Sequence, residues 1–319
     1  MNWTKLGKIF DPADHALGDG CREFAQSPQV LTCGEDLRIY FSTRSVDQIN
    51  GKFLSRIAYV DMRGDFSKIN GVSDHTVIPL GDLGCFDEHG IFPLSPVRVG
   101  DLVYAYTCGW SRRVSVSVET AIGLAISNDD GKTFAKVGNG PVLSASLHEP
   151  CLVGDGFVRF FNGLFHMWYI FGTGWRKYTP DGQPERIYKI AHAISDDGIH
   201  WSKEEGRRII SDKLGEDECQ ALPSVIRTGD RYHMFFCYRE AFDFRTGTGR
   251  GYRIGHAWSD DLHTWIRSQN DICGEGEPGD WDGEMQCYPH VFEHRQKIYL
   301  LYNGNRFGRH GFGLAVLEE

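Results

Sequence analysis

Acidic side chains stand at fixed distances before five regularly spaced valines of this 319-residue chain. The valines are Val30, Val97, Val158, Val225 and Val291, at intervals of 67, 61, 67 and 66 residues. Six candidate catalytic carboxylates lie seven, nine or three residues before a valine: Glu23, Glu88, Glu149, Asp155, Glu218 and Glu284. Carboxylates held close together in a low-dielectric site have pKa values that separate, so one donates a proton while another accepts. The pattern predicts acid–base catalysis, with Glu218 as the acid and Asp155 or Glu149 as the base or nucleophile.

Amide, imidazole and guanidinium groups accompany these carboxylates. Glu218-x-Gln220 and Glu284-x-Gln286 are the same motif twice, and the candidate binding residues beside the carboxylates are Arg22, His89, His148, Gln220 and Gln286. These groups suit the hydroxyls of a substrate. The alternative for each carboxylate is an ion pair or a backbone contact that holds repeated units together.

A second set of binding candidates lies in loops that follow aromatic strands: Trp110, Trp175, Arg239 and Arg306. Aromatic faces stack on sugar rings, and guanidinium forks hold hydroxyl or carboxylate groups. These loops predict a carbohydrate ligand and leave open whether that ligand is anionic. The alternative for Arg239 and Arg306 is an ion pair with the glutamates.

The elements that must position these residues are repeated strands. After each valine strand comes a turn, an alternating aromatic strand, and a third strand that ends in a turn rich in Asp and Gly before an aromatic residue, as in 125–134, 193–201 and 257–265. Period-two alternation between such turns indicates β-strands. Five repeats of four antiparallel strands predict an all-β, five-bladed β-propeller.

The last repeat lacks its fourth strand, because the chain ends soon after Leu317. The segment Trp3-Thr4-Lys5 resembles Trp201-Ser202-Lys203, so we expect the N-terminal strand to complete the last blade and cover its open edge. The prediction is one domain, 1–319, with approximate blades 22–80, 81–143, 144–211, 212–273, and 274–319 plus 1–12. Segments that enter the inner strands of a propeller line one mouth of its funnel, where the carboxylates should converge.

The Asp-rich turns themselves have a structural interpretation. In Ser127-x-Asp129-x-Gly131, the Ser and Asp side chains should accept bonds from backbone N–H groups, while Gly adopts a positive φ. The aromatic residue that follows should pack between sheets. We therefore expect these turns at the rim, away from the ligand.

Composition narrows the class of protein. A net charge of -9 and a pI near 5.8 argue against nucleic acid or an anionic membrane as partner. No apolar run has the length of a signal peptide or membrane span. Nine scattered cysteines, without Cys-x-x-Cys, predict reduced thiols and a cytoplasmic protein without a zinc site. No cofactor is expected; a calcium ion in the central channel has no supporting ligand spacing. The oligomeric state is not indicated.

The repeats resemble the five-bladed propeller glycoside hydrolases of families 43 and 32 and their relatives. The resemblance rests on the five units, on 195–201 and 259–265, and on 302–308 leading into 311–315. It implies a hydrolase acting on a glycosidic bond, with three carboxylates in a funnel. The Asp-Pro usual in these enzymes before the first inner strand is replaced here by Ser27-Pro28, and the second blade has Leu94-Ser95-Pro96.

Two other functions are compatible with these residues. One is a non-hydrolytic protein that binds or processes a carbohydrate or nucleotide-sugar during polysaccharide biosynthesis, which the missing Asp-Pro favours. The other is a sialidase-like enzyme, suggested by the Asp-rich turns.

Overall fold

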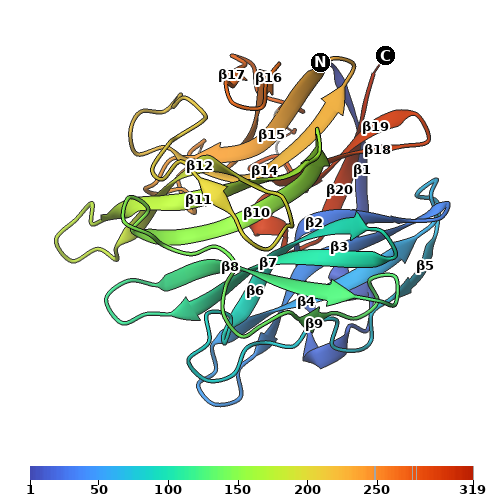
Figure 1. The fold of residues 1–319 in the computed structure, drawn as a ribbon, viewed down its shortest axis with the longest axis horizontal. Helices are drawn as coiled ribbons and strands as arrows, with labels where there is room; N and C mark the ends of the chain where they lie inside the picture. Colours follow the sequence, from blue (N-terminus) through green and yellow to red (C-terminus); the bar gives the residue numbers. More distant parts are fainter. Residues whose placement is uncertain (248, 275, 278, 319) are drawn as a thin grey trace.

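The computed structural model is an all-β structure, and it describes residues 1–247, 249–274, 276–277 and 279–318. Within these residues the strands form three four-stranded sheets and one eight-stranded sheet (Figure 1). The eight-stranded sheet consists of two antiparallel units joined by one parallel bridge, Ser55–Gly90. We number the repeated units 1 to 5 along the chain.

The strands of each unit follow one another in sequence. Unit 1 contains β2 (Glu23–Cys33), β3 (Asp36–Val46), β4 (Phe53–Met62) and β5 (Ile69–Val72). Unit 2 contains β6 (Gly90–Val99), β7 (Leu102–Arg112), β8 (Val118–Ser127) and β9 (Ala135–Lys136). Unit 3 contains β10 (Cys151–Phe161), β11 (Leu164–Arg176), β12 (Glu185–Ser195) and β13 (Ser202–Lys203). Unit 4 contains β14 (Cys219–Thr228), β15 (Arg231–Arg239), β16 (Arg253–Ser259) and β17 (Ile266–Arg267).

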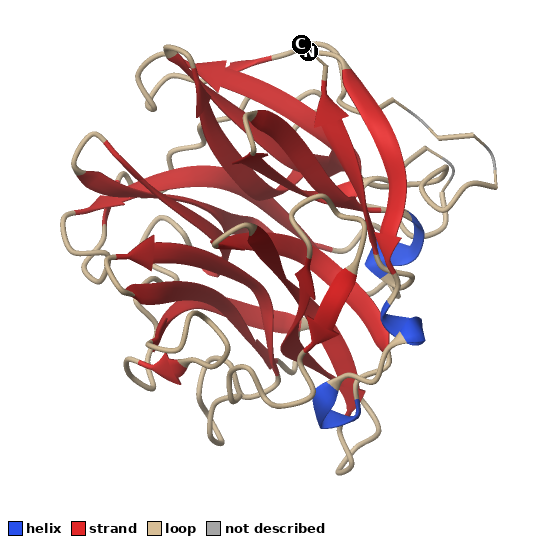
Figure 2. Ribbon diagram, turned by 90° about the vertical axis from the view of Figure 1, so that its right-hand side faces the viewer, coloured by secondary structure: helices blue, strands red, loops and turns tan. Residues whose placement is uncertain are grey.

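Unit 5 joins the two ends of the chain. It contains β18 (Cys287–His294), β19 (Lys297–Asn303), β20 (Phe312–Leu317) and the N-terminal strand β1 (Trp3–Phe10). β1 pairs antiparallel with β20, with Trp3 opposite Leu317, and the termini lie side by side in both views (Figures 1 and 2). The predicted completion of the last unit by the N-terminal strand is confirmed. Short helical turns lie at η1 (Pro12–Asp14), η2 (Gly18–Gly20) and α1 (Asn305–Gly308).

The first strands of the five units contact one another in a ring: β2 with β6, β6 with β10, β10 with β14, β14 with β18, and β18 with β2. Backbone N–H groups of the repeated valines supply some of these contacts. Val30 donates to Nε2 of His290 at 3.1 Å, and Val291 donates to Oγ of Ser224 at 3.0 Å. The first strands therefore surround a common centre.

A second ring of contacts runs along the outside. The aromatic residue after each third strand packs on the second strand of the preceding unit: Phe66 on Tyr299, Phe134 on Tyr40, Trp201 on Tyr106, Trp265 on Trp168, and Trp3 on Phe235. In units 2, 3 and 4 the Asp-rich turns hold these aromatics in place. Ser195 Oγ accepts from the N–H of Gly198 at 2.8 Å, and Asp197 accepts from the N–H of His200 at 2.8 Å. The turns have the structural role that their residues predict.

Within the described residues, no helix has the length and apolar character needed to span a membrane.

Candidate functional site

A cavity of about 280 Å³ lies where the first strands of the units meet. Each of the five first strands contributes at least one lining residue: Gln26 from β2, Phe92 from β6, Leu152 and Asp155 from β10, Ala221 from β14, and Tyr288 from β18. The cavity is therefore at the N-terminal ends of the first strands, the location that the repeat predicts for a ligand site.

A bulge in the first strands shapes this cavity. Residues three positions before the repeated valine have a positive φ in four units: 54° at Ser27, 52° at Asp155, 49° at Leu222 and 57° at Tyr288. The pairing register to the second strand shifts at the same points. A left-handed backbone at a non-glycine residue costs of order 1–3 kcal/mol and persists where surrounding structure enforces it. Here the bulges turn two of these side chains, Asp155 and Tyr288, into the cavity.

Asp155 is the one carboxylate among the described residues that line the cavity. Its side chain is largely buried, with 7% of the residue exposed. Burial raises the pKa of Asp155 to about 7, although a backbone hydrogen bond from Leu222 and the positive charge of Arg186 both lower it. Near neutral pH this carboxyl group therefore exists in both protonated and ionised forms, as a proton-transfer group requires.

The remaining walls combine aromatic rings with two arginines. Trp110, Tyr188 and Tyr252 line the cavity together with the guanidinium-bearing Arg44 and Arg186. Aromatic faces of this kind suit a sugar ring. Trp175 lies directly opposite Arg186 in the β11–β12 ladder, so it is adjacent to this wall.

Sequence reasoning missed Arg186 and three tyrosines, although a signal existed. Thr120, Tyr188 and Tyr252 all line the cavity and all stand five residues before the alanine of the third-strand phrase, at 125, 193 and 257. Tyr288 shares the offset of Asp155 from its valine. The third strands begin at the same end of each sheet as the first strands, because neighbours in the sheet are antiparallel and the second strand runs back between them.

Arg239 lies behind the tyrosine wall and is 1% exposed. Its Nη2 donates to the hydroxyl of Tyr188 at 2.8 Å, and that hydroxyl lies 2.5 Å from the hydroxyl of Tyr252. The ring of Phe244 covers the guanidinium at 3.4 Å. Arg239 therefore acts on the cavity through the two tyrosines and does not itself line it.

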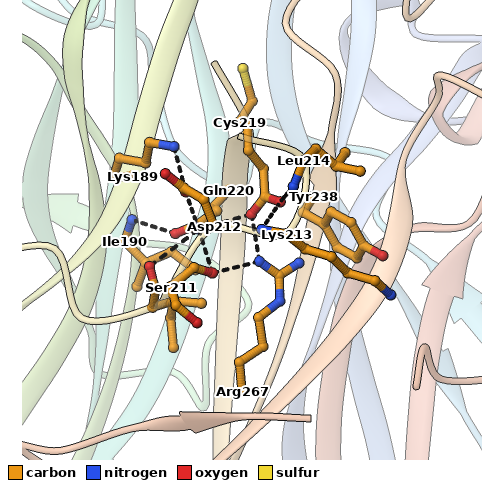
Figure 3. A network of polar contacts seen from close by, with 12 residues as sticks. Lys189, Ile190, Ser211, Asp212, Lys213, Leu214, Cys219, Gln220, Tyr238 and Arg267 are labelled. Atoms are coloured by element: carbon orange, nitrogen blue, oxygen red, sulfur yellow. Dashed lines mark hydrogen bonds and ion pairs between the residues drawn. The ribbon is translucent and has the colours of Figure 1, made fainter. Parts of the chain in front are cut away.

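The structure places Glu218 and Gln220 outside the cavity. Both belong to a buried polar network, of which Figure 3 labels Gln220 and Arg267. The carboxylate of Glu218 accepts from Arg267 at 2.6 Å and from the backbone N–H groups of Lys213 and Leu214 at 2.8 and 2.9 Å. Gln220 donates to Glu218 at 2.9 Å. Both residues are fully buried, so their hydrogen-bonding groups are already occupied by the protein.

Glu149 has an equivalent environment in unit 3. It is fully buried, pairs with Lys203 Nζ, and accepts from the hydroxyl of Tyr169 at 2.8 Å. The same pair recurs as Asp87–Lys136 at 2.5 Å in unit 2 and Asp282–Lys5 at 2.9 Å in unit 5. Each cation stands opposite the third-strand alanine, namely Lys136 at Ala125, Lys203 at Ala193, Arg267 at Ala257, and Lys5 at Ala315. These carboxylates tie the segment that enters a unit to the outer strand of that unit.

Two further carboxylates also contact a basic side chain of the protein. Glu23 accepts from Arg309 at 2.8 Å, and Glu88 lies 3.1 Å from Nε2 of His89. The ring of His89 stacks behind Trp110, with centroids 5.9 Å apart, and burial lowers its pKa. The predicted pairing of Arg239 or Arg306 with the glutamates does not occur among the described residues, where Arg309 takes that role.

The last predicted residues lie away from the cavity. Glu284 and Gln286 border a separate hollow of about 810 Å³, where Gln286 donates to the carbonyl of Gly274 at 2.7 Å. Arg22, His148 and Arg306 are exposed and do not line the cavity. The expected convergence of six carboxylates in the cavity is therefore wrong. Of the six, Asp155 lines the cavity, and so does Trp110 from the predicted binding residues. The other five carboxylates either pair with a nearby side chain or, like Glu284, border the separate hollow.

Metal ligands do not cluster in the described part of the chain. No group of three or more His, Cys, Asp or Glu side chains there has an arrangement that could hold a metal ion.

Comparison with known structures identifies the fold. Similar structures include a "Glycoside hydrolase" (TM-score 0.72, 16% identity, 99% of this chain and 92% of that chain) and a "thermostable family-43 glycoside hydrolase" (TM-score 0.63, 14% identity, 94% and 89%). Another is the "Beta-1,2-Mannobiose phosphorylase from Listeria innocua - beta-1,2-mannobiose complex" (TM-score 0.65, 12% identity, 100% and 97%). The chain thus has the fold of family-43-like glycoside hydrolases and related propeller enzymes.

Comparison of sequences gives full-length relatives. No family model matches the chain. Two proteins of Mycobacterium tuberculosis, "Uncharacterized protein Rv1502" (strain ATCC 25618 / H37Rv) and "Uncharacterized protein MT1551" (strain CDC 1551 / Oshkosh), are each 35% identical over 320 residues, covering 100% of both chains. The chain belongs to the family of these two mycobacterial proteins.

Proposed function

We propose that this protein is a carbohydrate-active enzyme that acts on a glycosidic bond in the central cavity, with Asp155 as the proton donor. The observation that carries the proposal is the environment of Asp155, the one carboxylate lining the cavity in the described chain. Burial raises the pKa of Asp155 to about 7, so a substantial fraction of the group carries its proton at neutral pH. General acids that protonate a leaving oxygen are tuned in this way.

The fold and the lining support a sugar as the ligand. Proteins with similar structures include glycoside hydrolases and a phosphorylase in complex with beta-1,2-mannobiose. Trp110, Tyr188 and Tyr252 offer aromatic faces to a ring. We propose that the five units form one five-bladed propeller domain, because the first strands contact one another in a ring and the N-terminal strand completes unit 5.

The buried carboxylates have a structural role in this proposal. Glu149 and Glu218 each neutralise a cation on the fourth strand of their own unit. A carboxylate that already accepts bonds from a cation and from other groups of the protein offers little to a substrate. Asp155 is then the acid, in place of Glu218.

A second candidate is a protein that binds a carbohydrate without cleaving it. The observation that favours it is the absence of a second carboxylate from the described cavity lining. Hydrolysis usually needs two such groups, one as acid and one as base or nucleophile. All nine cysteines are free, which supports a reducing compartment, and we propose the cytoplasm.

The test compares the wild-type protein with Asp155→Asn on a panel of oligosaccharides and activated glycosides. Product formation is followed by mass spectrometry, with and without acceptor alcohols or phosphate in the buffer. We expect Asp155→Asn to lower kcat about 100-fold or more, since general acid catalysis contributes about 10²–10⁴-fold. Glu284→Gln is the matched control, because Glu284 is exposed and away from the cavity.

Two results would decide against the enzyme. If Asp155→Asn retained wild-type kcat, Asp155 would not be the acid. If calorimetry detected a bound oligosaccharide that stayed intact with every acceptor, the binding protein would be the correct function.

A further inference from the structure

The cavity has an excess of positive groups. Arg44 and Arg186 line it, whereas Asp155 is the one acidic lining residue in the described chain. Neither arginine forms an ion pair with a carboxylate among the described residues. Arginines elsewhere do so, as Arg112 does with Asp47 at 3.1 Å. A guanidinium without a counter-charge in a partly closed cavity is a ready partner for an anion.

Arg44 is held in place without being neutralised. Its Nη2 donates to the side-chain oxygen of Gln26 at 3.2 Å, and the ring of Phe24 lies 4.3 Å from the guanidinium carbon. Its Nε is buried and has no acceptor within the part of the chain that the structure describes. Burial also lowers the pKa of Arg44, which means that the site destabilises the charge until an anion compensates it.

The tyrosine wall supplies one further donor. Tyr188 and Tyr252 have two hydroxyl hydrogens between them, and the 2.5 Å contact between their oxygens uses one. Arg239 can only donate, so it does not accept the other. Burial raises the pKa of both tyrosines, so both protons remain at neutral pH. One tyrosine O–H therefore has no acceptor among the described residues, and the charge of Arg239 lies beside the hydroxyl pair.

We propose that the cavity binds an anionic oxygen group, a phosphate or a carboxylate, through Arg44, Arg186 and the hydroxyl pair of Tyr188 and Tyr252. The proposal rests on the proposed function in placing this group beside a sugar whose glycosidic bond Asp155 protonates. It gives the two arginines the negative charge that Asp155, partly protonated near neutral pH, does not fully supply.

The anionic group has two possible sources, and each has a defined chemistry. With free inorganic phosphate, one phosphate oxygen forms a bond to the anomeric carbon while the bond from that carbon to the glycosidic oxygen breaks. The electron pair of the broken bond stays on the glycosidic oxygen, which takes the proton of Asp155. The products are a sugar 1-phosphate and an alcohol, and Asp155 regains its proton from water. With an acidic sugar, the arginines hold the carboxylate of the substrate itself.

Calorimetry with the intact protein tests this site. The probes are inorganic phosphate, sodium glucuronate and glucose, all at fixed ionic strength. Glucose is the control for glucuronate, because it is a similar sugar without the carboxylate. We expect at least one anion to bind and glucose to bind more weakly. Arg44→Met and Arg186→Met should each weaken anion binding about tenfold or more, because a charge-assisted bond is lost. Arg306→Met, at an exposed arginine outside the cavity, should leave binding unchanged.

Phosphate and glucuronate also distinguish the two possible sources of the anionic group, free phosphate and an acidic sugar. Phosphate binding together with phosphate-dependent cleavage supports free phosphate, while preferential glucuronate binding supports an acidic sugar. Failure of both anions to bind, or equal binding by wild type, Arg44→Met and Arg186→Met, would overturn the proposal. If Arg44→Met does not fold, Arg44→Lys tests the same contact, since it keeps the charge and loses the planar fork.

Anion binding needs no turnover, so this proposal and the proposed function fail separately. Loss of activity in Asp155→Asn without any anion binding removes only the anion site. Anion binding with full activity in Asp155→Asn removes only the assignment of Asp155.

Discussion

Arg267 donates a 2.6 Å hydrogen bond to the carboxylate of Glu218, and neither side chain is more than 6% exposed. Arg267 lies on the outermost strand of unit 4, while Glu218 directly precedes its innermost strand. Units 2, 3 and 5 contain the same kind of pair. Each pair therefore joins the two ends of one unit, which ordinary strand pairing leaves apart.

Replacing Glu218 with Gln should destabilise the protein without changing ligand binding. Arg267 would stay buried without its counter-charge, and removal of one partner of a buried pair costs about 3–5 kcal/mol. Urea denaturation at pH 7 measures the change in the free energy of unfolding. Glu204→Gln is the matched control, because its pair with Arg207 is largely exposed and worth about 0–1 kcal/mol.

The opposite outcome for Glu218 is equally measurable. A Glu218→Gln protein with an unchanged urea midpoint and no turnover would return Glu218 to the catalytic group, as the sequence pattern suggested.

Asp155 should impose two pH dependences, one on catalysis with a midpoint near pH 7 and one on stability between about pH 4 and pH 7. As the acid, it works in its protonated form, so kcat/KM should fall as pH rises above about 7. For stability, the folded pKa of Asp155 lies above the ordinary value of 3.8, so the native state binds the proton more tightly. Its contribution is fully present below about pH 4 and is lost as pH rises to about 7.

The Asp155→Asn variant isolates the contribution of the Asp155 carboxyl group to the pH dependence of stability, because an amide does not titrate. The difference in melting temperature between Asp155→Asn and wild type should grow in favour of the variant between pH 4 and 7, then stay constant. A difference that does not change with pH over this range would show that Asp155 has an ordinary pKa.

The fold could be predicted from the sequence because its signals are local and repeated. Each unit carries its own valine strand and aromatic strand, and units 1 to 4 add an Asp-rich turn whose bonds depend on neighbours such as Ser195 and Asp197. The completion of unit 5 followed from the likeness of Trp3-Thr4-Lys5 to Trp201-Ser202-Lys203. Such signals need no knowledge of distant contacts.

The site could be predicted only in part, because the fate of a carboxylate depends on a distant partner. Glu149 and Lys203 are far apart in sequence, and no local pattern around Glu149 reveals that a cation will cover it. A periodic signal was nevertheless present: a Lys or Arg stands two residues after the rim aromatic at Lys5, Lys136, Lys203 and Arg267. A partly buried cation at this repeat position in four units requires a buried carboxylate beside it in each of them.

Acid should destabilise the protein through His256. Burial and the nearby His233 lower the pKa of His256 to about 4, so it stays neutral in the folded state. The unfolded chain binds a proton below about pH 6.5. The contribution of His256 is therefore present above pH 6.5 and lost as pH falls towards 4, by about 2 kcal/mol between pH 6.5 and 5.

Thermal unfolding at pH 7.5 and pH 5 checks this prediction on wild type and His256→Gln. The variant should lose less stability on acidification, although it starts lower because its contacts with His233 and Ser268 are altered. Equal losses in the two proteins would mean that His256 titrates normally in the folded state.

Trp3 should stabilise the whole ring, because it joins the first residues of the chain to two units at once. Its strand completes the sheet of unit 5, while its ring packs edge-on against Phe235 of unit 4 at 5.4 Å. Trp3→Ala should lower the free energy of unfolding by about 3 kcal/mol, as expected for a large apolar side chain in a packed interface. Leu6→Ala on the same strand is the control, since Leu6 is 51% exposed and should change stability by less than about 0.5 kcal/mol. Equal effects of the two substitutions in urea denaturation would show that unit 5 is closed by backbone pairing alone.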